Sequence, residues 1–206
     1  MARAPGAGLA QRGLQPLLGR AGAARLQAAL VTRAARWAAQ TGPTTIAFTP
    51  DDARQEIAAL VPEGVELTPQ GRGDLGERLW RATTHAAERH GGPVIVVGDD
   101  QPALSRHHVE AVVDDFAEGI DVTLGPSTDG GYYLLAARRP RQEVFEIDPG
   151  AWGGPRVMEL TLQAVLGAGL SVGWLRSERA LSEPADAAAL LADPCTPRDI
   201  AAALRP

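Results

Sequence analysis

Two kinds of hydrophobic pattern alternate along this chain. Short runs rich in β-branched and apolar residues predict strands at 44–49, 65–68, 94–97, 121–124, 132–136 and 171–175. Between them, apolar residues that recur every three or four positions predict helices at 23–37, 51–60, 75–90, 105–117, 155–166 and 184–191. Residues 1–19, rich in glycine and proline, are interpreted as a loop. The alternation indicates an α/β fold, a three-layer α/β/α sandwich with a mostly parallel sheet.

Length and composition predict one domain that does not span a membrane. The 206 residues are 45% hydrophobic, which is enough for a sizeable core, so residues 1–206 are expected to form a single domain. No apolar run approaches the roughly 18 residues that a membrane helix needs. The one cysteine, Cys195, has no partner for an internal disulfide. A cytoplasmic location is the expectation that fits these features.

The net charge of −5 is unevenly distributed along the chain. Residues 1–50 contain six Arg and no acid, which leaves fourteen Arg against 25 acids, a formal charge of −11, in the remainder. We predict that this cationic segment is folded and faces phosphate groups. The absence of serine argues against a transit peptide, and the overall acidity argues against a nucleic-acid partner. All basic residues are Arg, so no single Arg is assigned a role on residue type alone.

Acidic residues follow two of the predicted strands. Asp99 and Asp100 come directly after strand 94–97, and Asp129 lies with Gly130 and Gly131 before strand 132–136. Because ligands bind at the carboxyl ends of strands in open α/β sheets, we expect Asp100 and Asp129 to meet in one cleft. Carboxylates together with phosphate oxygens are typical ligands of Mg²⁺, so a divalent cation, Mg²⁺ or Mn²⁺, is predicted there. One of the two residues Asp99 and Asp100 is expected only to cap a turn.

Other motifs leave more than one interpretation open. Gly71–Gly76 reads as GxGxxG, which favours either a dinucleotide site in a dehydrogenase or a loop with a capped helix start. The glycines at 130 and 131 serve either a turn or the close approach of a ligand. Trp152 is predicted either to stack on a sugar or to pack on the core. The four histidines lack metal-ligand spacing and are expected to be exposed.

Taken together, the motifs resemble those of the DUF2064 family, GT-A-like proteins of the nucleotide-diphospho-sugar transferase superfamily. The resemblance rests on the segments Met1–Gly8, Gln70–Arg78, Gly98–Pro102, Gly125–Pro126 and Asp129–Tyr133, and it extends over nearly the whole chain. It implies a nucleotide or nucleotide-sugar ligand, a divalent cation and a small-molecule acceptor.

The resemblance also implies roles for individual residues. The predicted nucleotide-binding residues are Arg3, Gly8, Arg12, Gln70, Gly73 and Asp74. The predicted metal ligands are Asp100 and Asp129, and the predicted acceptor-binding residues are Gly130, Gly131, Tyr132 and Trp152. No catalytic residue and no oligomeric state follow from the sequence.

The chain departs from the family pattern in three places. The first strand of the fold has no apolar counterpart before the glycine-rich loop, so it is expected to be missing or to begin upstream. An expected Lys-Thr-Arg-Leu reads Gln11-Arg12-Gly13-Leu14, and an expected Asp-x-Asp reads Ala180-Leu181-Ser182. The departures leave three functions open: a glycosyltransferase-like enzyme, a nucleotidyltransferase, and a nucleotide-binding relative without catalysis.

Overall fold

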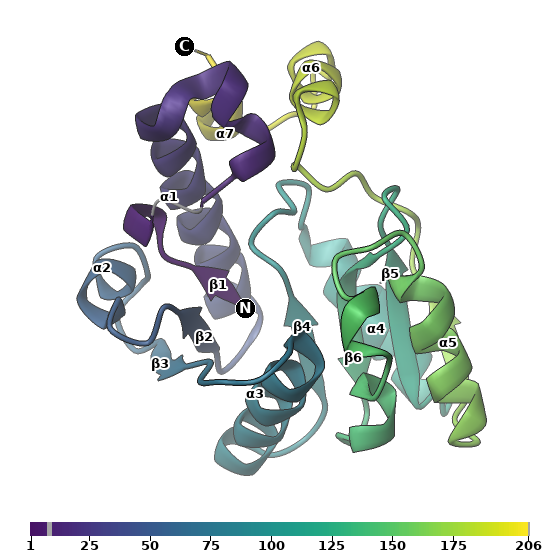
Figure 1. The fold of residues 1–206 in the computed structure, drawn as a ribbon. Helices are drawn as coiled ribbons and strands as arrows, with labels where there is room; N and C mark the ends of the chain where they lie inside the picture. Colours follow the sequence, from purple (N-terminus) through teal and green to yellow (C-terminus); the bar gives the residue numbers. More distant parts are fainter. Residues whose placement is uncertain (8–9, 206) are drawn as a thin grey trace. The chain divides into compact units, whose positions relative to one another are not determined.

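The computed structural model describes residues 1–7 and 10–205, which form two compact units. We call residues 1–69, 98–104 and 179–206 the first unit, and residues 70–97 and 105–178 the second unit. Each unit has its own sheet and helices (Figure 1). The α/β class predicted from the sequence is confirmed, whereas the assignment of residues 1–206 to one domain stays a prediction. None of the described helices is long and apolar enough to cross a membrane.

The sheet of the first unit is parallel throughout. Its strands are β1 (Ala2–Arg3), β2 (Thr45–Thr49) and β3 (Glu66–Pro69), in the order β1-β2-β3. Ala2 pairs with Phe48, and Arg3 pairs with Thr49. A first strand is therefore present, as two residues, where the sequence had indicated loop. The pairing explains the difference, because a strand this short has no hydrophobic alternation to detect and is defined by its neighbour.

The helices of the first unit bury two apolar clusters. They are α1 (Gln15–Thr41), α2 (Arg54–Ala58), α6 (Pro184–Ala192) and α7 (Arg198–Ala203), with the short 3₁₀ helices η1 (Pro5–Ala7) and η2 (Arg12–Leu14). One cluster joins α1 and α2 to the sheet through Val31, Phe48 and Ile57. The other joins α1 to α6 and α7 through Leu26 and Ile200. Helix α7 was not predicted, because its six residues are too few for a periodic pattern.

The second unit contains a mixed sheet in the order β4-β6-β5-β7. The strands are β4 (Val94–Val97), β5 (Val122–Pro126), β6 (Tyr132–Ala137) and β7 (Val172–Trp174). Strand β6 is antiparallel to both β4 and β5, and β5 is parallel to β7. Strand β6 is thus the exception to the mostly parallel arrangement that the sequence predicted. Only residues 127–131 connect β5 to β6, and a connection this short forces the strands to run antiparallel.

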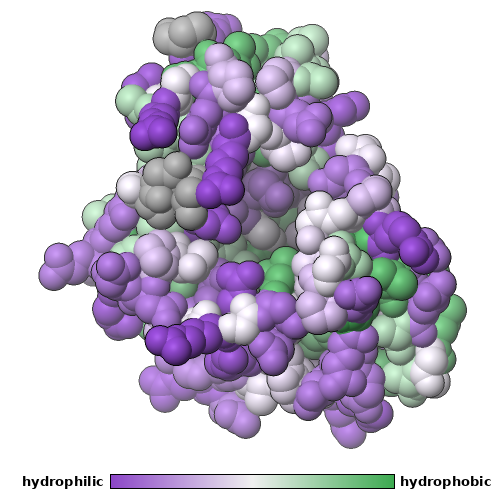
Figure 2. Space-filling view, in the orientation of Figure 1, coloured by the Kyte–Doolittle hydropathy of each residue, from purple (hydrophilic) through white to green (hydrophobic). Residues whose placement is uncertain are grey.

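The helices of the second unit are α3 (Leu75–His90), α4 (Arg106–Ala117) and α5 (Val157–Gly167), with η3 (Gln142–Phe145) and η4 (Pro149–Ala151). Helix α3 contacts β4 and η3, and α5 contacts η3. The visible face in Figure 2 is mostly hydrophilic, and hydrophobic side chains show over α5. On that helix Leu166 is exposed.

Candidate functional site

A buried glutamine organises the amino-terminal loop in the first unit. Gln27, on α1, has only 1% of its surface exposed. Its Nε2 donates to Arg3 O (2.9 Å) and to Asp99 Oδ2 (2.6 Å), and its Oε1 accepts from Gln11 Nε2 (2.9 Å). Because a buried amide left without partners costs free energy, these bonds define where residues 3 and 11 lie. Gln27 was not among the predicted site residues, although a polar residue between the apolar positions Ala23, Leu26 and Leu30 is a detectable signal in the sequence.

Asp99 belongs to this network and not to an open carboxylate site. Its Oδ2 also accepts the backbone N–H of Arg3 (2.7 Å). Burial raises the pKa of Asp99, and the hydrogen bonds from Arg3 and Gln27 oppose that shift. One of the two neighbouring aspartates was expected to cap a turn, whereas the Asp99 carboxylate accepts hydrogen bonds from the distant residues Arg3 and Gln27. The bond from Arg3 N holds the Arg3 backbone beside Asp99, which directly precedes Asp100. The Arg3 side chain remains exposed.

The altered residues of the amino-terminal loop have a structural reason. Gln11 adopts a left-handed conformation (φ 44°) and directs its amide to Gln27. A Cβ added to Gly13 would lie 2.2 Å from the backbone O of Ser182, so only glycine fits there. Arg12 is exposed at the start of η2. Gly8, predicted to contact phosphate, lies outside the described residues.

Asp100 lies in the first unit beside the segment that precedes α6. Its backbone O accepts Leu181 N (2.9 Å), and its Oδ1 would lie 2.6 Å from a Cβ added to Gly98. The next carboxylates in the sequence, Glu183 and Asp186, take part in the cap of α6. Glu183 caps α6, and Asp186 accepts N–H groups from Ser182 and Glu183. Burial favours the neutral form of Asp186, yet these bonds and the Arg179 ion pair lower its pKa.

These residues do not form a metal cage made by protein alone. Within residues 1–7 and 10–205, no three His, Cys, Asp or Glu side chains gather closely enough to hold an ion. Ala180 and Ser182 occupy the positions where the family resemblance implies Asp, so Asp100 is the carboxylate left for such a role. A single carboxylate fits a cation only where phosphate oxygens complete the coordination, as is usual for Mg²⁺.

In the second unit, the turn Gln70–Asp74 is held by contacts from its own helix. Arg81 Nη1 donates to Gln70 O (2.5 Å) and Nη2 donates to Arg72 O (3.1 Å). Arg78 Nη1 donates to Gln70 Oε1 (2.8 Å). Gly71 and Gly73 have φ of +73° and +108°, the left-handed region that glycine enters at little cost. The predicted nucleotide-binding residues Gln70, Gly73 and Asp74 therefore form one rigid turn.

The start of α3 argues against the dinucleotide interpretation of Gly71–Gly76. Asp74 Oδ1 accepts Glu77 N (2.9 Å), and Glu77 Oε2 accepts Asp74 N (3.1 Å), which is a complete capping box. A pyrophosphate in a dinucleotide fold needs free N–H groups at this helix end. Here a carboxylate occupies that position and would repel it. The alternative, a capped helix start, is what the structure contains.

The loop after β5 is closed by its own backbone and by α5. Asp129 is exposed, and its Oδ1 accepts Gly131 N (3.0 Å). Gly130 has φ +91°, and an added Cβ would lie 2.2 Å from Pro155 O. Packing against Pro155, just before α5, is thus sufficient reason for glycine at 130. The described atoms offer no hydrogen-bond partner to the buried Tyr132 hydroxyl, and burial raises its pKa.

Packing defines the positions of His108 and Trp152. His108 was expected to be exposed but is only 4% exposed on α4. Four residues before the buried Val112, it lies on the inner face of the helix, a periodic signal that the sequence analysis overlooked. Trp152 packs toward α3, with its ring 3.1 Å from a Cβ added to Gly76. Of its two predicted roles, this contact favours packing on the core.

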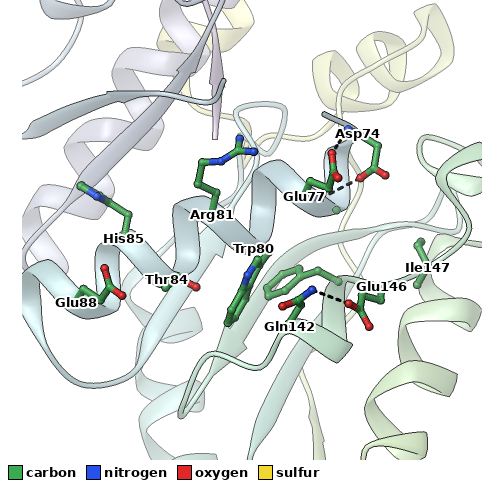
Figure 3. A pocket seen from close by; sticks show the side chains of 12 residues that line it. Asp74, Glu77, Trp80, Arg81, Thr84, His85, Glu88, Gln142, Glu146 and Ile147 are labelled. Carbon is green, nitrogen blue, oxygen red and sulfur yellow. Dashed lines mark hydrogen bonds between the residues drawn. The ribbon is translucent and has the colours of Figure 1, made fainter. Parts of the chain in front are cut away.

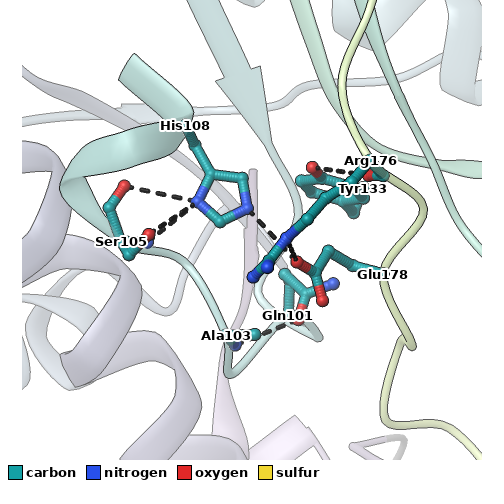
Figure 4. A network of polar contacts seen from close by, with 7 residues as sticks. All are labelled: Gln101, Ala103, Ser105, His108, Tyr133, Arg176 and Glu178. Carbon is teal, nitrogen blue, oxygen red and sulfur yellow. Dashed lines mark hydrogen bonds and ion pairs between the residues drawn. The ribbon is translucent and has the colours of Figure 1, made fainter. Parts of the chain in front are cut away.

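His108 belongs to a polar network that supports strand β6 (Figure 4). Its Nδ1 accepts Ser105 N (3.1 Å), so the proton of the neutral ring is on Nε2, which lies 3.6 Å from Glu178 Oε1. The ring meets Tyr133 edge-on, with centroids 5.5 Å apart. Tyr133 donates to Arg176 O (3.2 Å), and burial raises its pKa to about 12. Tyr133 thus lies in the core, at 2% exposure.

The second unit also contains a pocket of about 820 Å³ along α3 (Figure 3). Its lining residues come from α3 and from η3 with the two residues that follow it: Asp74, Gly76, Glu77, Trp80, Arg81, Thr84, His85, Glu88, Gln142, Phe145, Glu146 and Ile147. Only Asp74 among the predicted site residues lines it. Of the other predicted site residues of this unit, Gln70 and Gly73 lie in the turn at 70–74, and those at 129–131 lie in the loop between β5 and β6. Tyr132 begins β6, and Trp152 packs toward α3.

Asp100 and Asp129 belong to different units, so their predicted convergence on one ion stays a prediction. Arg3, Arg12 and Asp100 belong to the first unit. Gln70, Gly73, Asp74, Gly130, Gly131, Tyr132 and Trp152 belong to the second unit.

Comparisons with known proteins agree with this fold. The model of a family described as "Uncharacterized protein conserved in bacteria (DUF2064)" matches residues 31–152, more than half of the chain. A candidate nucleotide-diphospho-sugar transferase from Desulfovibrio desulfuricans G20 superposes with a TM-score of 0.87 at 24% identity, over 98% of this chain and 90% of that one. CMP:2-keto-3-deoxy-manno-octonic acid synthetase with CTP superposes at 0.53 and 13% identity, over 76% and 83%. No curated protein matches the chain.

Proposed function

The chain belongs to the DUF2064 family, and from this premise we propose that it is a transferase that uses a nucleotide-activated sugar as donor. The reaction breaks the bond between the sugar and the diphosphate, and negative charge develops on the departing nucleoside diphosphate. Cationic side chains and a divalent cation stabilise such a leaving group. The proposal assigns this role to Arg3 and Arg12, with Asp100 as the protein's ligand to the cation.

One observation carries the proposal: the hydrogen bond between Arg3 N and Asp99 Oδ2. It holds the start of the cationic loop directly beside the residue that precedes Asp100. A loop with exposed Arg side chains next to a carboxylate is the arrangement that a diphosphate with its cation requires, since the Arg groups face phosphate oxygens and the carboxylate faces the ion. The buried Gln27 keeps both parts in register through bonds to Arg3 and Asp99.

The nucleoside is assigned to the turn Gln70–Asp74. Support comes from its rigidity, because Arg78 and Arg81 hold it before any ligand arrives, and a prearranged site loses less entropy on binding. The Gln70 and Asp74 side chains already have partners in α3. The proposal therefore gives the contact with the nucleoside mainly to the backbone at Gly71 and Gly73, which carry no side chains of their own.

Nucleotidyl transfer is the second candidate. The likeness to the synthetase that holds CTP favours it, as does the sharing of one fold by both activities. Product analysis separates the two: release of pyrophosphate from an NTP indicates nucleotidyl transfer, and release of a nucleoside diphosphate indicates glycosyl transfer. The residues Gln11, Ala180 and Ser182 favour the third candidate, a nucleotide-binding relative without catalysis, for which binding without either product is expected.

Calorimetric titration tests the proposal. Wild-type protein is titrated with CTP and with UDP-, GDP- and CDP-sugars, each with and without Mn²⁺. We expect at least one nucleotide to bind more tightly with Mn²⁺, and Asp100→Asn to abolish that gain. Asp52→Asn removes the same charge from an exposed position of the same unit and should bind as wild type. Binding that ignores Mn²⁺, or no binding of any of these ligands, contradicts the proposal.

A further inference from the structure

The pocket along α3 has an aromatic wall. Trp80 and Phe145 lie with their ring centroids 6.3 Å apart at an interplanar angle of 41°. Phe145 is 3% exposed and anchored, whereas Trp80 is half-buried, and Figure 3 shows its indole between α3 and the segment with Gln142. Gly76 permits this arrangement, because an added Cβ would lie 2.3 Å from Phe145 O. The wall therefore consists of two tilted aromatic rings, of which Trp80 is partly exposed.

The polar lining of the pocket is acidic. Asp74, Glu77, Glu88 and Glu146 line it, and Arg81 is the only Arg or Lys among the lining residues. The Arg81 guanidinium is already bonded to the backbone O atoms of Gln70 and Arg72. A phosphate or carboxylate ligand would meet net repulsion here, since like charges at close range are costly. The pocket is thus unsuited to the diphosphate of a nucleotide.

Most of these carboxylates already accept a hydrogen bond from another group of the protein. The carboxylates of Asp74 and Glu77 accept backbone N–H groups in the capping box, and Glu146 Oε1 accepts Gln142 Nε2 (2.7 Å). Their remaining lone pairs call for hydrogen-bond donors, which hydroxyl groups supply without the cost of burying an ammonium. Gln142 and His85 add polar groups on the same rim. The chemistry of the lining matches a ligand with one apolar face and many hydroxyls.

We propose that this pocket binds an uncharged, hydroxyl-rich ring of the size of a mono- or disaccharide, with its C–H face on Trp80 and its hydroxyls toward Glu146, Gln142 and Glu88. A volume of about 820 Å³ is in the range of small-ligand sites. The claim that the bound ring is the acceptor rests on the proposed transferase function. As a binding site, the pocket depends only on the second unit, which contains all the lining residues.

The test uses methyl glycosides of glucose, galactose, mannose and N-acetylglucosamine, added to the full chain without nucleotide. Binding is followed by the NMR signal of the Trp80 indole N–H and by calorimetry. We expect at least one glycoside to shift that signal, and Trp80→Ala to weaken its binding about tenfold, through loss of the aromatic face. Trp174→Ala is the matched control, because Trp174 is 51% exposed on β7 of the same unit and does not line the pocket.

A second variant covers the case in which Trp80→Ala does not fold. Gln142→Ala removes an exposed amide from the rim and is expected to weaken the same glycoside severalfold. Absence of any shift with all four glycosides overturns the inference. Tighter binding of a trimethylammonium probe than of every glycoside also overturns it, because the site would then be cationic in its preference.

The failures of the two proposals are distinguishable. The same samples are titrated with the nucleotides described above, whose assigned contacts do not include Trp80. If glycosides fail and nucleotides bind with Mn²⁺, the pocket assignment alone is wrong. If glycosides bind and nucleotides do not, the transferase proposal is wrong while the glycoside site stands.

Discussion

The amino-terminal loop and the turn Gln70–Asp74 are both candidate ligand loops, yet they are held in different ways. The turn is held by residues within eleven positions of Gln70, through Arg78, Arg81 and the capping box. The loop is held by Gln27 and by Asp99, which is 96 positions from its partner Arg3. A loop stabilised by its own motif tolerates change elsewhere, whereas a loop stabilised by a distant buried side chain depends on that single residue.

The largest effect is therefore expected in the amino-terminal loop. Gln27→Leu removes the bonds to Arg3, Gln11 and Asp99 and leaves the Asp99 carboxylate against an apolar side chain. We expect the free energy of unfolding to fall by about 3 kcal/mol. Urea denaturation measures it. Gln40→Leu makes the same substitution at an exposed position of α1 and should change stability by less than about 0.5 kcal/mol. Equal losses in the two variants would show that Gln27 has no special role.

The close approach of Ser182 to η2 gives the next largest effect. Gly13→Ala places a Cβ 2.2 Å from Ser182 O, which the backbone relieves only by moving. We expect a loss of about 2 kcal/mol, the range for overpacking. Gly42→Ala is the control, because Gly42 has an extended φ of 165° and no atom within 4 Å of the added Cβ. Thermal unfolding of the two variants should separate them; a Gly13→Ala protein as stable as Gly42→Ala would contradict the packing described for this loop.

A smaller effect is expected in the turn of the second unit. Asp74→Ala removes the carboxylate that accepts Glu77 N and should cost about 1 kcal/mol, the usual value of a helix N-cap. Asp74→Asn keeps an acceptor oxygen and should retain most of that stability. Chemical denaturation compares the two. If both variants lose the same amount, the charge of Asp74 matters and its capping bond does not.

The smallest effect concerns the pH dependence of stability. Burial lowers the pKa of His108, so the folded protein keeps this ring neutral at a pH where the unfolded chain, with a pKa of about 6.5, takes up a proton. Stability linked to His108 is therefore complete above about pH 6.5 and declines as pH falls below it. His108→Gln should remove part of this acid-side decline in urea midpoints. His107→Gln, at a side chain 91% exposed, should leave the decline as in wild type, and matching profiles for both variants would refute the assignment.

The elements that the sequence predicted well depend on residues that are close together along the chain. Helix α3 starts at its capping residue Asp74, and β4 spans the four residues of its apolar run, because caps and runs are local signals. The antiparallel direction of β6 and the two-residue β1 depend on which segments meet in space. No local pattern encodes such meetings unambiguously. The short connection at 127–131 was the one local sign of the antiparallel pair.

The candidate site shows the same division. The turn at 70–74 was recognised from its motif, and its contacts agree with a preformed loop. Gln27 was missed because its importance comes from partners at positions 3, 11 and 99. The pocket at Trp80 was missed because its two walls are about 60 positions apart and carry no shared motif. Pairing of distant segments is therefore the information that the sequence patterns lacked.

The central claim is that Asp100 is the protein's ligand to a nucleotide-bound cation. Paramagnetic broadening of backbone amide signals by Mn²⁺, in the presence of a nucleoside diphosphate, tests it most directly. We predict selective broadening at residues 99–101 and its loss in Asp100→Asn. No selective broadening at these residues, or broadening that Asp100→Asn leaves unchanged, would contradict the claim.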